Sequence, residues 1–135
     1  MSEYEILVLA AKAAGVVYDE AASQPKEGRE WWGLWLKIEG EPSEYDRRYW
    51  NPLADDGDAM RLANRCCICI EFGYCSDDAP VVRCGQIENW ADWPMVANFP
   101  DPGKATRRAI VEAAVAKQLE YERVIAECAI PEAGG

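Results

Sequence analysis

The sequence predicts an α+β fold: a mainly antiparallel sheet of about four strands flanked by three helices, like an α/β/α sandwich. Segments near both ends of the chain carry apolar residues at helical spacing, and two segments between them alternate apolar and polar residues as half-buried strands do. At 135 residues the chain is long enough to bury one hydrophobic core. We therefore expect a single α+β domain over residues 1–135.

Three segments are predicted to be helical. The first is Glu3–Ala14, with Gly15 at the position of a C-terminal cap. The second covers about residues 56–64, and the third about residues 102–128, with Asp101 and Pro102 as its cap and first residue. At 1.5 Å per residue the last helix would reach roughly 38 Å, more than a domain of this size needs. We therefore expect a homodimer or small homo-oligomer in which its later turns pack on a second copy.

Strands are predicted at residues 16–18, 31–38, 66–72 and 81–87, the last two as a hairpin, with polar loops at 21–30 and 40–48. In the second strand, alternation assigns one face to the core and leaves Trp31 and Trp35 on the other. These two tryptophans are expected under a helix rather than as an exposed stacking platform. The loop at 89–103 is either an aromatic lid over the sheet edge or a binding loop. The predicted core face of the second strand is Trp32, Leu34, Leu36 and Ile38.

The stretch Trp50-Asn51-Pro52-Leu53-Ala54-Asp55-Asp56-Gly57-Asp58 leads into the second helix. Asp55 is placed to cap the exposed amides, and Asp58 three residues later completes a variant of the capping box. An EF-hand calcium loop is excluded, because aligning Gly57 with the required glycine puts Ala63 where the bidentate glutamate belongs.

Charge and composition limit the classes of partner. Fourteen basic and twenty-four acidic residues give a formal net charge of −10, which disfavours a basic surface for nucleic acid or anionic membrane. The start of the sequence lacks the basic region of a secretory signal, and no apolar run approaches the about 18 residues of a membrane span. We expect a cytoplasmic protein that binds neither nucleic acid nor membrane directly.

The six cysteines are predicted to be free thiols, because stable disulfides are not expected in a reducing compartment. A thiolate zinc site built on Cys67 and Cys69, with Cys75 or Cys84, is the less favoured alternative, since the chain has no histidine. We expect neither a bound metal nor a cofactor.

Catalysis finds little support in the residue pattern. Without histidine there is no Ser/His/Asp or Cys/His relay, and the chain has neither a Walker glycine loop nor a dinucleotide fingerprint. A metal-dependent hydrolase using Asp55, Asp56 and Asp58 is a second alternative, but capping already explains these carboxylates. The chain is therefore expected not to be an enzyme.

Arg107 and Arg108 lie near the start of the last predicted helix, where cations oppose the helix dipole. Either they pair with Asp55, Asp56 or Asp58, or they join free helix amides in an anion site. The structural ion pair is the favoured interpretation, because acidic partners are plentiful.

Three blocks of sequence resemble a family of small, functionally uncharacterised proteins encoded by tailed bacteriophages and prophages. They are the stretch from Trp50 to Asp58, Ala10-Ala11-Lys12-Ala13-Ala14-Gly15, and Ala105-Thr106-Arg107-Arg108-Ala109-Ile110-Val111. The resemblance implies a viral accessory protein in an infected bacterial host, and such proteins often counter host defences.

Two functions then compete. The first is inhibition of a host defence complex, such as a CRISPR effector, by an acidic face that occupies its basic nucleic-acid channel. The second is a sponge that sequesters a nucleotide immune signal through arginine–phosphate contacts and base stacking. The candidate acidic face is Glu39, Glu41, Glu44, Asp46, Asp77 and Asp78, and the candidate ligand site is Trp50, Asn51, Arg107 and Arg108.

Overall fold

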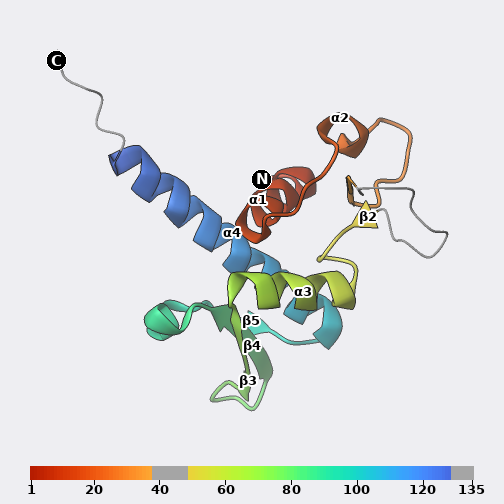
Figure 1. Ribbon diagram of the computed structural model, residues 1–135. Coiled ribbons are helices and arrows are strands. Elements are labelled where there is room, and N and C mark those ends of the chain that lie inside the picture. Colours follow the sequence, from red (N-terminus) through yellow and green to blue (C-terminus); the bar gives the residue numbers. More distant parts are fainter. Residues whose placement is uncertain (38–48, 129–135) are drawn as a thin grey trace.

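The computed structural model describes residues 1–37 and 49–128, and over these residues the fold is α+β, which confirms the predicted class (Figure 1). The helices carry most of the described chain, and the strands are short. In chain order the elements are α1 (Glu3–Ala14), α2 (Glu20–Ser23), β1 (Leu34–Trp35), β2 (Tyr49–Trp50), α3 (Asp56–Cys66), β3 (Cys69–Tyr74), β4 (Pro80–Gly85), the 3-10 helix η1 (Ile87–Asp92), β5 (Val96–Ala97) and α4 (Pro102–Cys128).

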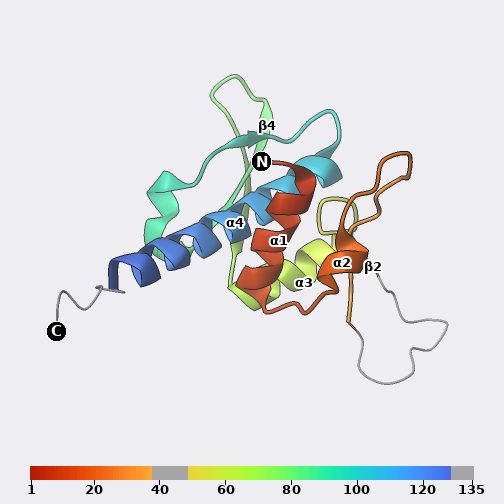
Figure 2. The same cartoon turned by 90° about the horizontal axis from the view of Figure 1, so that it is seen from above.

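The strands form two small antiparallel sheets instead of the single sheet of about four strands that was predicted. One has the order β1-β2 and the other β3-β4-β5. The layering also differs from a sandwich of helices around a sheet. Helix α4 packs on α1, α3 and β4, while α1 also contacts β1, so these helices lie between the two sheets (Figures 1 and 2). The predicted strand at 16–18 contributes only an isolated bridge between Tyr18 and Leu36.

Helix α1 begins and ends where the sequence predicts, because both ends have local caps. The Ser2 side chain accepts a hydrogen bond from the Glu5 N–H at 3.2 Å. At the other end Gly15 adopts φ 70°, a left-handed conformation that glycine reaches without strain.

Helix α3 runs two residues further than predicted, so the strand expected from residue 66 begins only at Cys69. Cys66 closes the helix, and Cys67 serves as its left-handed cap with φ 54°. The adjacent cysteines are therefore not neighbours on a strand. The hairpin of β3 and β4 forms as predicted, with Ile70 opposite Cys84.

The predicted alternation over residues 31–38 fails at Gly33, which adopts φ 134° against the backbone of Trp50. Leu34 is fully buried as expected, whereas Trp32 is 58% exposed and is not a core residue. Trp31 packs edge-on against Tyr4 of α1, and Trp35 packs edge-on against Tyr49, so both are half-buried. Ile38 lies outside the described residues.

The loop predicted at 89–103 contains part of η1 and all of β5. Trp93 is buried and donates its indole N–H to the Gln86 carbonyl oxygen at 2.8 Å, and its ring lies against Gly85, where any Cβ would collide with it. Trp93 thus seals the end of β4 as an aromatic lid would. Trp90 and Phe99 remain about half exposed.

The core lies where the helices meet. Its largest fully buried side chains include Leu7 of α1, Leu62 of α3, Val82 of β4, and Ile110 and Val111 of α4. Across the described residues, none of the helices combines the length and apolar character that crossing a bilayer requires.

Helix α4 covers the predicted range, and Asp101 caps it by accepting from the Lys104 N–H at 3.1 Å. Burial stops at Val115, and residues 119–128 are all exposed. The last turns extend away from the rest of the described chain (Figures 1 and 2).

Candidate functional site

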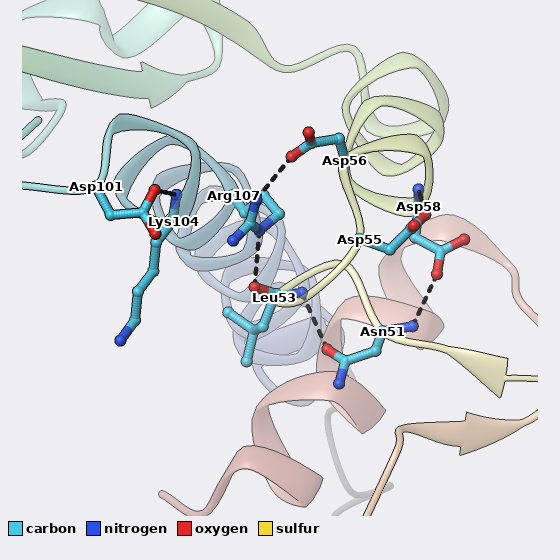
Figure 3. A network of polar contacts seen from close by, with 8 residues as sticks. All are labelled: Asn51, Leu53, Asp55, Asp56, Asp58, Asp101, Lys104 and Arg107. Atoms are coloured by element: carbon cyan, nitrogen blue, oxygen red, sulfur yellow. Dashed lines mark hydrogen bonds and ion pairs between the residues drawn. The ribbon is translucent and has the colours of Figure 1, made fainter.

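The segment after β2 is a turn organised by Asn51 (Figure 3). The Asn51 carbonyl oxygen accepts from the N–H groups of Ala54 and Asp55 at 3.1 and 2.9 Å, and its side-chain oxygen accepts from the Leu53 N–H at 3.1 Å. Its side-chain NH2 donates to the Trp32 carbonyl oxygen at 3.2 Å. These four bonds fix the direction in which the chain enters α3.

Asp58 holds the same turn from inside the helix. Its Oδ2 accepts from the Asn51 N–H at 3.0 Å, its Oδ1 accepts from Arg61 Nη2 at 2.7 Å, and the residue is 3% exposed. Asp55 caps α3 by accepting from the Asp58 N–H at 2.8 Å. Because the Asp55 N–H already donates to Asn51, the reciprocal bond of a capping box passes back to the Asn51 N–H. The predicted capping variant is confirmed.

Arg107 ties the start of α4 to the start of α3. Its Nη1 lies 2.8 Å from Asp56 Oδ1, and its Nε donates to the Leu53 carbonyl oxygen at 2.9 Å (Figure 3). The structural ion pair predicted for Arg107 is therefore confirmed. Arg108 instead pairs with Glu112, four residues further along the same helix, at 3.0 Å.

Each of the four candidate ligand-site residues is either buried or paired with a carboxylate. Trp50 is 5% exposed and Asn51 is 8% exposed, so neither presents a stacking face or a free amide to solvent. Arg107 and Arg108 have the carboxylate partners just described. Asp55 and Asp58 both lie beside Arg61, whereas Asp56 pairs with Arg107. Within the described residues no three His, Cys, Asp or Glu side chains gather as metal ligands. These contacts give each residue a structural role.

Of the six candidate acidic residues, the structure describes only Asp77 and Asp78. Both are exposed at the tip of the β3–β4 hairpin. Asp77 Oδ1 accepts from the Ala79 N–H at 3.3 Å, and Asp78 adopts φ 63° and donates its N–H to the Cys75 carbonyl oxygen at 2.9 Å. Turn geometry accounts for both residues. Glu39, Glu41, Glu44 and Asp46 lie outside the described residues.

The six cysteines all lie in the described residues, and none of them is paired in a disulfide. Burial raises the pKa of Cys84 to about 12 and also raises the pKa of Cys66. Cys66 and Cys69 have the Cys-x-x-Cys spacing typical of zinc sites, but within the described residues no three potential metal ligands gather there. Cys66 is buried at the end of α3, and Cys69 is half-buried on β3.

A closed polar cluster, not foreseen from the sequence, joins β3, β4 and η1. The Glu71 carboxylate accepts from Arg83 Nη2 at 2.7 Å and from the Trp90 indole N–H at 2.8 Å, and these bonds lower the pKa of Glu71. The Arg83 guanidinium lies 3.9 Å from the Trp90 ring centroid. The cluster binds η1 to the sheet, and its charges are mutually satisfied.

The exposed end of α4 carries an apolar stripe, which we define as Tyr121, Val124, Ile125 and Cys128. At 100° per residue the four positions fall within an arc of about 100°, and the same arc contains the buried Ile110 upstream. The three largest side chains of the stripe are between 42% and 59% exposed. The helix thus continues its core-facing surface past the point where the domain covers it.

Comparison of the chain with models of protein families, with curated proteins and with solved structures finds no match.

Proposed function

We propose that this chain is a phage-encoded, non-enzymatic binding protein that acts in the cytoplasm of an infected bacterium. It inhibits a host defence complex, such as a CRISPR effector, by occupying a basic surface that the complex uses for nucleic acid. The resemblance of its three sequence blocks to phage and prophage proteins supports the viral setting. The surface of α4 supports the mode of action.

The single observation that carries the proposal is the apolar stripe of α4. Apolar side chains that continue a buried face and lie together in solvent are typical of protein-binding surfaces. A helix that lays such a face into a groove is a common mode of recognition, with anchors at the spacing of Tyr121, Ile125 and Cys128. Burial of each large apolar anchor supplies about 1.5–3 kcal/mol.

The net charge supports a basic partner. A protein with a formal charge of −10 is drawn to a positively charged channel, and this steering raises the association rate more than the final affinity. In this account the stripe provides most of the affinity and the acidic residues provide orientation. Glu41, Glu44 and Asp46 belong to the proposed acidic face.

A second copy of the chain is the other proposed occupant of the stripe. We expect two copies to pair through α4 when the target is absent, because pairing removes the same apolar area from water. Light scattering at micromolar concentration measures this pairing. If the chain is a monomer and neither Ile125→Glu nor Ala126→Glu changes its mass in solution, the defence complex remains the one proposed occupant of the stripe.

The proposal is tested by the plating efficiency of a targeted phage on cells with an active CRISPR system. Expression of the chain should raise the plating efficiency, and Ile125→Glu should abolish that rise by placing a charge on the stripe. Ala126→Glu adds the same charge to the next exposed residue, about 100° around the helix, and should leave the rise intact.

Charge reversal tests the acidic contribution separately. A folded variant with Glu41, Glu44 and Asp46 changed to Lys should lose inhibition, and its residual binding should depend less on salt. Full inhibition by this triple variant would show that the acidic face is not required. Equal inhibition by Ile125→Glu and Ala126→Glu would show that the stripe is not required.

A further inference from the structure

A hollow of about 590 Å³ opens between the end of α1, the end of β1 and the outer side of α3. Its volume lies in the range of about 300–1,000 Å³ that small-molecule sites occupy. Its walls are mostly apolar. The apolar side chains that line it are Ala14, Val16, Val17, Leu36, Trp50 and Leu62.

The described polar residues that line the hollow are all basic: Lys37, Arg61 and Arg65. In a chain with twenty-four acidic and fourteen basic residues, a lining with three cations and no carboxylate runs against the overall charge. Of the three, Arg61 also pairs with Asp58 at 2.7 Å and lies 3.9 Å from Asp55, both at the start of α3. This group was not recognised from the sequence. The available signal was the spacing of Arg61 and Arg65, which places two cations on one side of α3.

The two arginines keep donors available after their internal contacts. Arg65 donates from Nη1 to the Ala14 carbonyl oxygen at 3.2 Å, which offsets the negative end of α1 at this edge of the hollow. Arg61 contacts Asp58 through Nη2, yet its side chain is 65% exposed. A guanidinium has five N–H donors, so each arginine can bind a further anion. Lys37 is exposed at the same rim.

We propose that this hollow binds a small amphipathic anion, with an apolar body against Val16, Leu36 and Leu62 and a single acidic group at the basic rim. The apolar lining selects against a nucleotide. Ribose hydroxyls and ring nitrogens would lose water against these walls without gaining partners. Trp50 is almost fully buried and offers little area for base stacking. The ligand class is therefore an apolar carboxylic or sulfonic acid, and the site is separate from the stripe of α4.

Two fluorescent probes that differ mainly in charge test the site on the full chain. 1-Anilinonaphthalene-8-sulfonate has an aromatic body and one sulfonate, and N-phenyl-1-naphthylamine has the same aromatic body without it. The sulfonate should bind at one site per chain, and the neutral probe should bind at least about tenfold more weakly, because a hydrogen bond to a charged group contributes about 1.5–3 kcal/mol. Equal affinities would overturn the proposal.

Variants locate the probe. Changing Lys37 and Arg65 together to Gln should weaken sulfonate binding by at least about tenfold, while the matched change of Lys104 and Arg108, away from the hollow, should leave it within about twofold. Val17→Trp, at an exposed wall position, should block both probes by filling the space. Unchanged melting temperatures establish that the variants fold.

Competition distinguishes an apolar acid from a nucleotide as the ligand, and a stripe variant distinguishes the hollow from the stripe as the binding surface. Decanoate should displace the sulfonate probe, whereas adenosine monophosphate should not. Ile125→Glu should leave probe affinity unchanged, because the stripe lies on another element. Displacement by adenosine monophosphate alone, or loss of binding in Ile125→Glu, would overturn the assignment.

Discussion

Replacing Asp58 with Ala should destabilise the protein far more than replacing Asp56, although both residues lie in the first turn of α3. Asp58 is 3% exposed and accepts from the Asn51 N–H, which is itself nearly buried. The change leaves that donor without a partner, at a cost of about 1–3 kcal/mol. It also removes the contact with the largely exposed Arg61, which contributes up to about 1 kcal/mol. We expect a total loss of about 1–4 kcal/mol.

Asp56→Ala is the matched control. The Asp56 side chain is 83% exposed, and Arg107 keeps its bond to the Leu53 carbonyl oxygen without it, so the loss should stay below about 1 kcal/mol. Asp58→Asn retains an acceptor for the Asn51 N–H and should fall between the two.

Urea unfolding at pH 7 and 25 °C, followed by tryptophan fluorescence, measures the free energy of unfolding of each variant. A loss below about 1 kcal/mol for Asp58→Ala would refute the structural role assigned to that carboxylate. An equal loss for Asp56→Ala would refute the distinction between a buried and an exposed aspartate.

Three further predictions concern the backbone, a buried thiol and metal. Gly33→Ala should cost more than about 2 kcal/mol in urea unfolding, because its Cβ would lie 2.5 Å from the Trp50 oxygen at φ 134°, whereas Gly73→Ala has open space and should cost less than about 1 kcal/mol. The raised pKa of Cys84 means that the unfolded chain loses this proton first, so the free energy of unfolding should fall as pH rises from 9 towards 12. Cys84→Ala should remove that part of the pH dependence, and an unchanged slope would contradict the assignment. Addition of EDTA should leave the melting temperature unchanged, while a large drop with stoichiometric release of zinc would identify a structural metal site.

The three long helices could be predicted because most of their ends are encoded locally, whereas the short α2 lies in a segment that was predicted to be loop. Gly15 supplies a left-handed cap, Asp55 and Asp58 supply the first-turn acceptors of α3, and Asp101 caps α4. A pairing of Arg107 with Asp55, Asp56 or Asp58 was the favoured prediction because acidic partners are plentiful, and the fold selects Asp56, 51 residues away.

The strands were harder to predict because their limits depend on distant packing. Gly33 breaks an alternating pattern at a position where the backbone passes close to Trp50, and no local residue pattern reports that approach. Helix α3 continues through Cys66 into a segment with a strand pattern. It ends at Cys67, which adopts a left-handed conformation that non-glycine residues seldom reach. Whether strands form one sheet or two is decided by the helices between them.

In the candidate sites too, local features could be predicted and features that depend on distant packing could not. Cap chemistry identified the roles of Asp55 and Asp58, but not the bond from the Asn51 N–H to Asp58 or the burial of these two residues. The ends of α1 and β1 and the helix α3 together form the basic hollow. Only the fold therefore brings Lys37 and Arg65 to the same hollow. The range of α4 followed from helical spacing alone.

The proposed binding of a host defence complex by the stripe of α4 is tested most directly by quantitative mass spectrometry of proteins that co-purify with the tagged chain from defence-competent cells. The comparison is between Ile125→Glu and Ala126→Glu. We predict that subunits of one defence complex co-purify with wild type and Ala126→Glu in equal amounts and fall at least tenfold with Ile125→Glu, because one lost apolar anchor costs about 1.5–3 kcal/mol. Equal recovery with both folded variants, or no defence subunit with wild type, would contradict the claim.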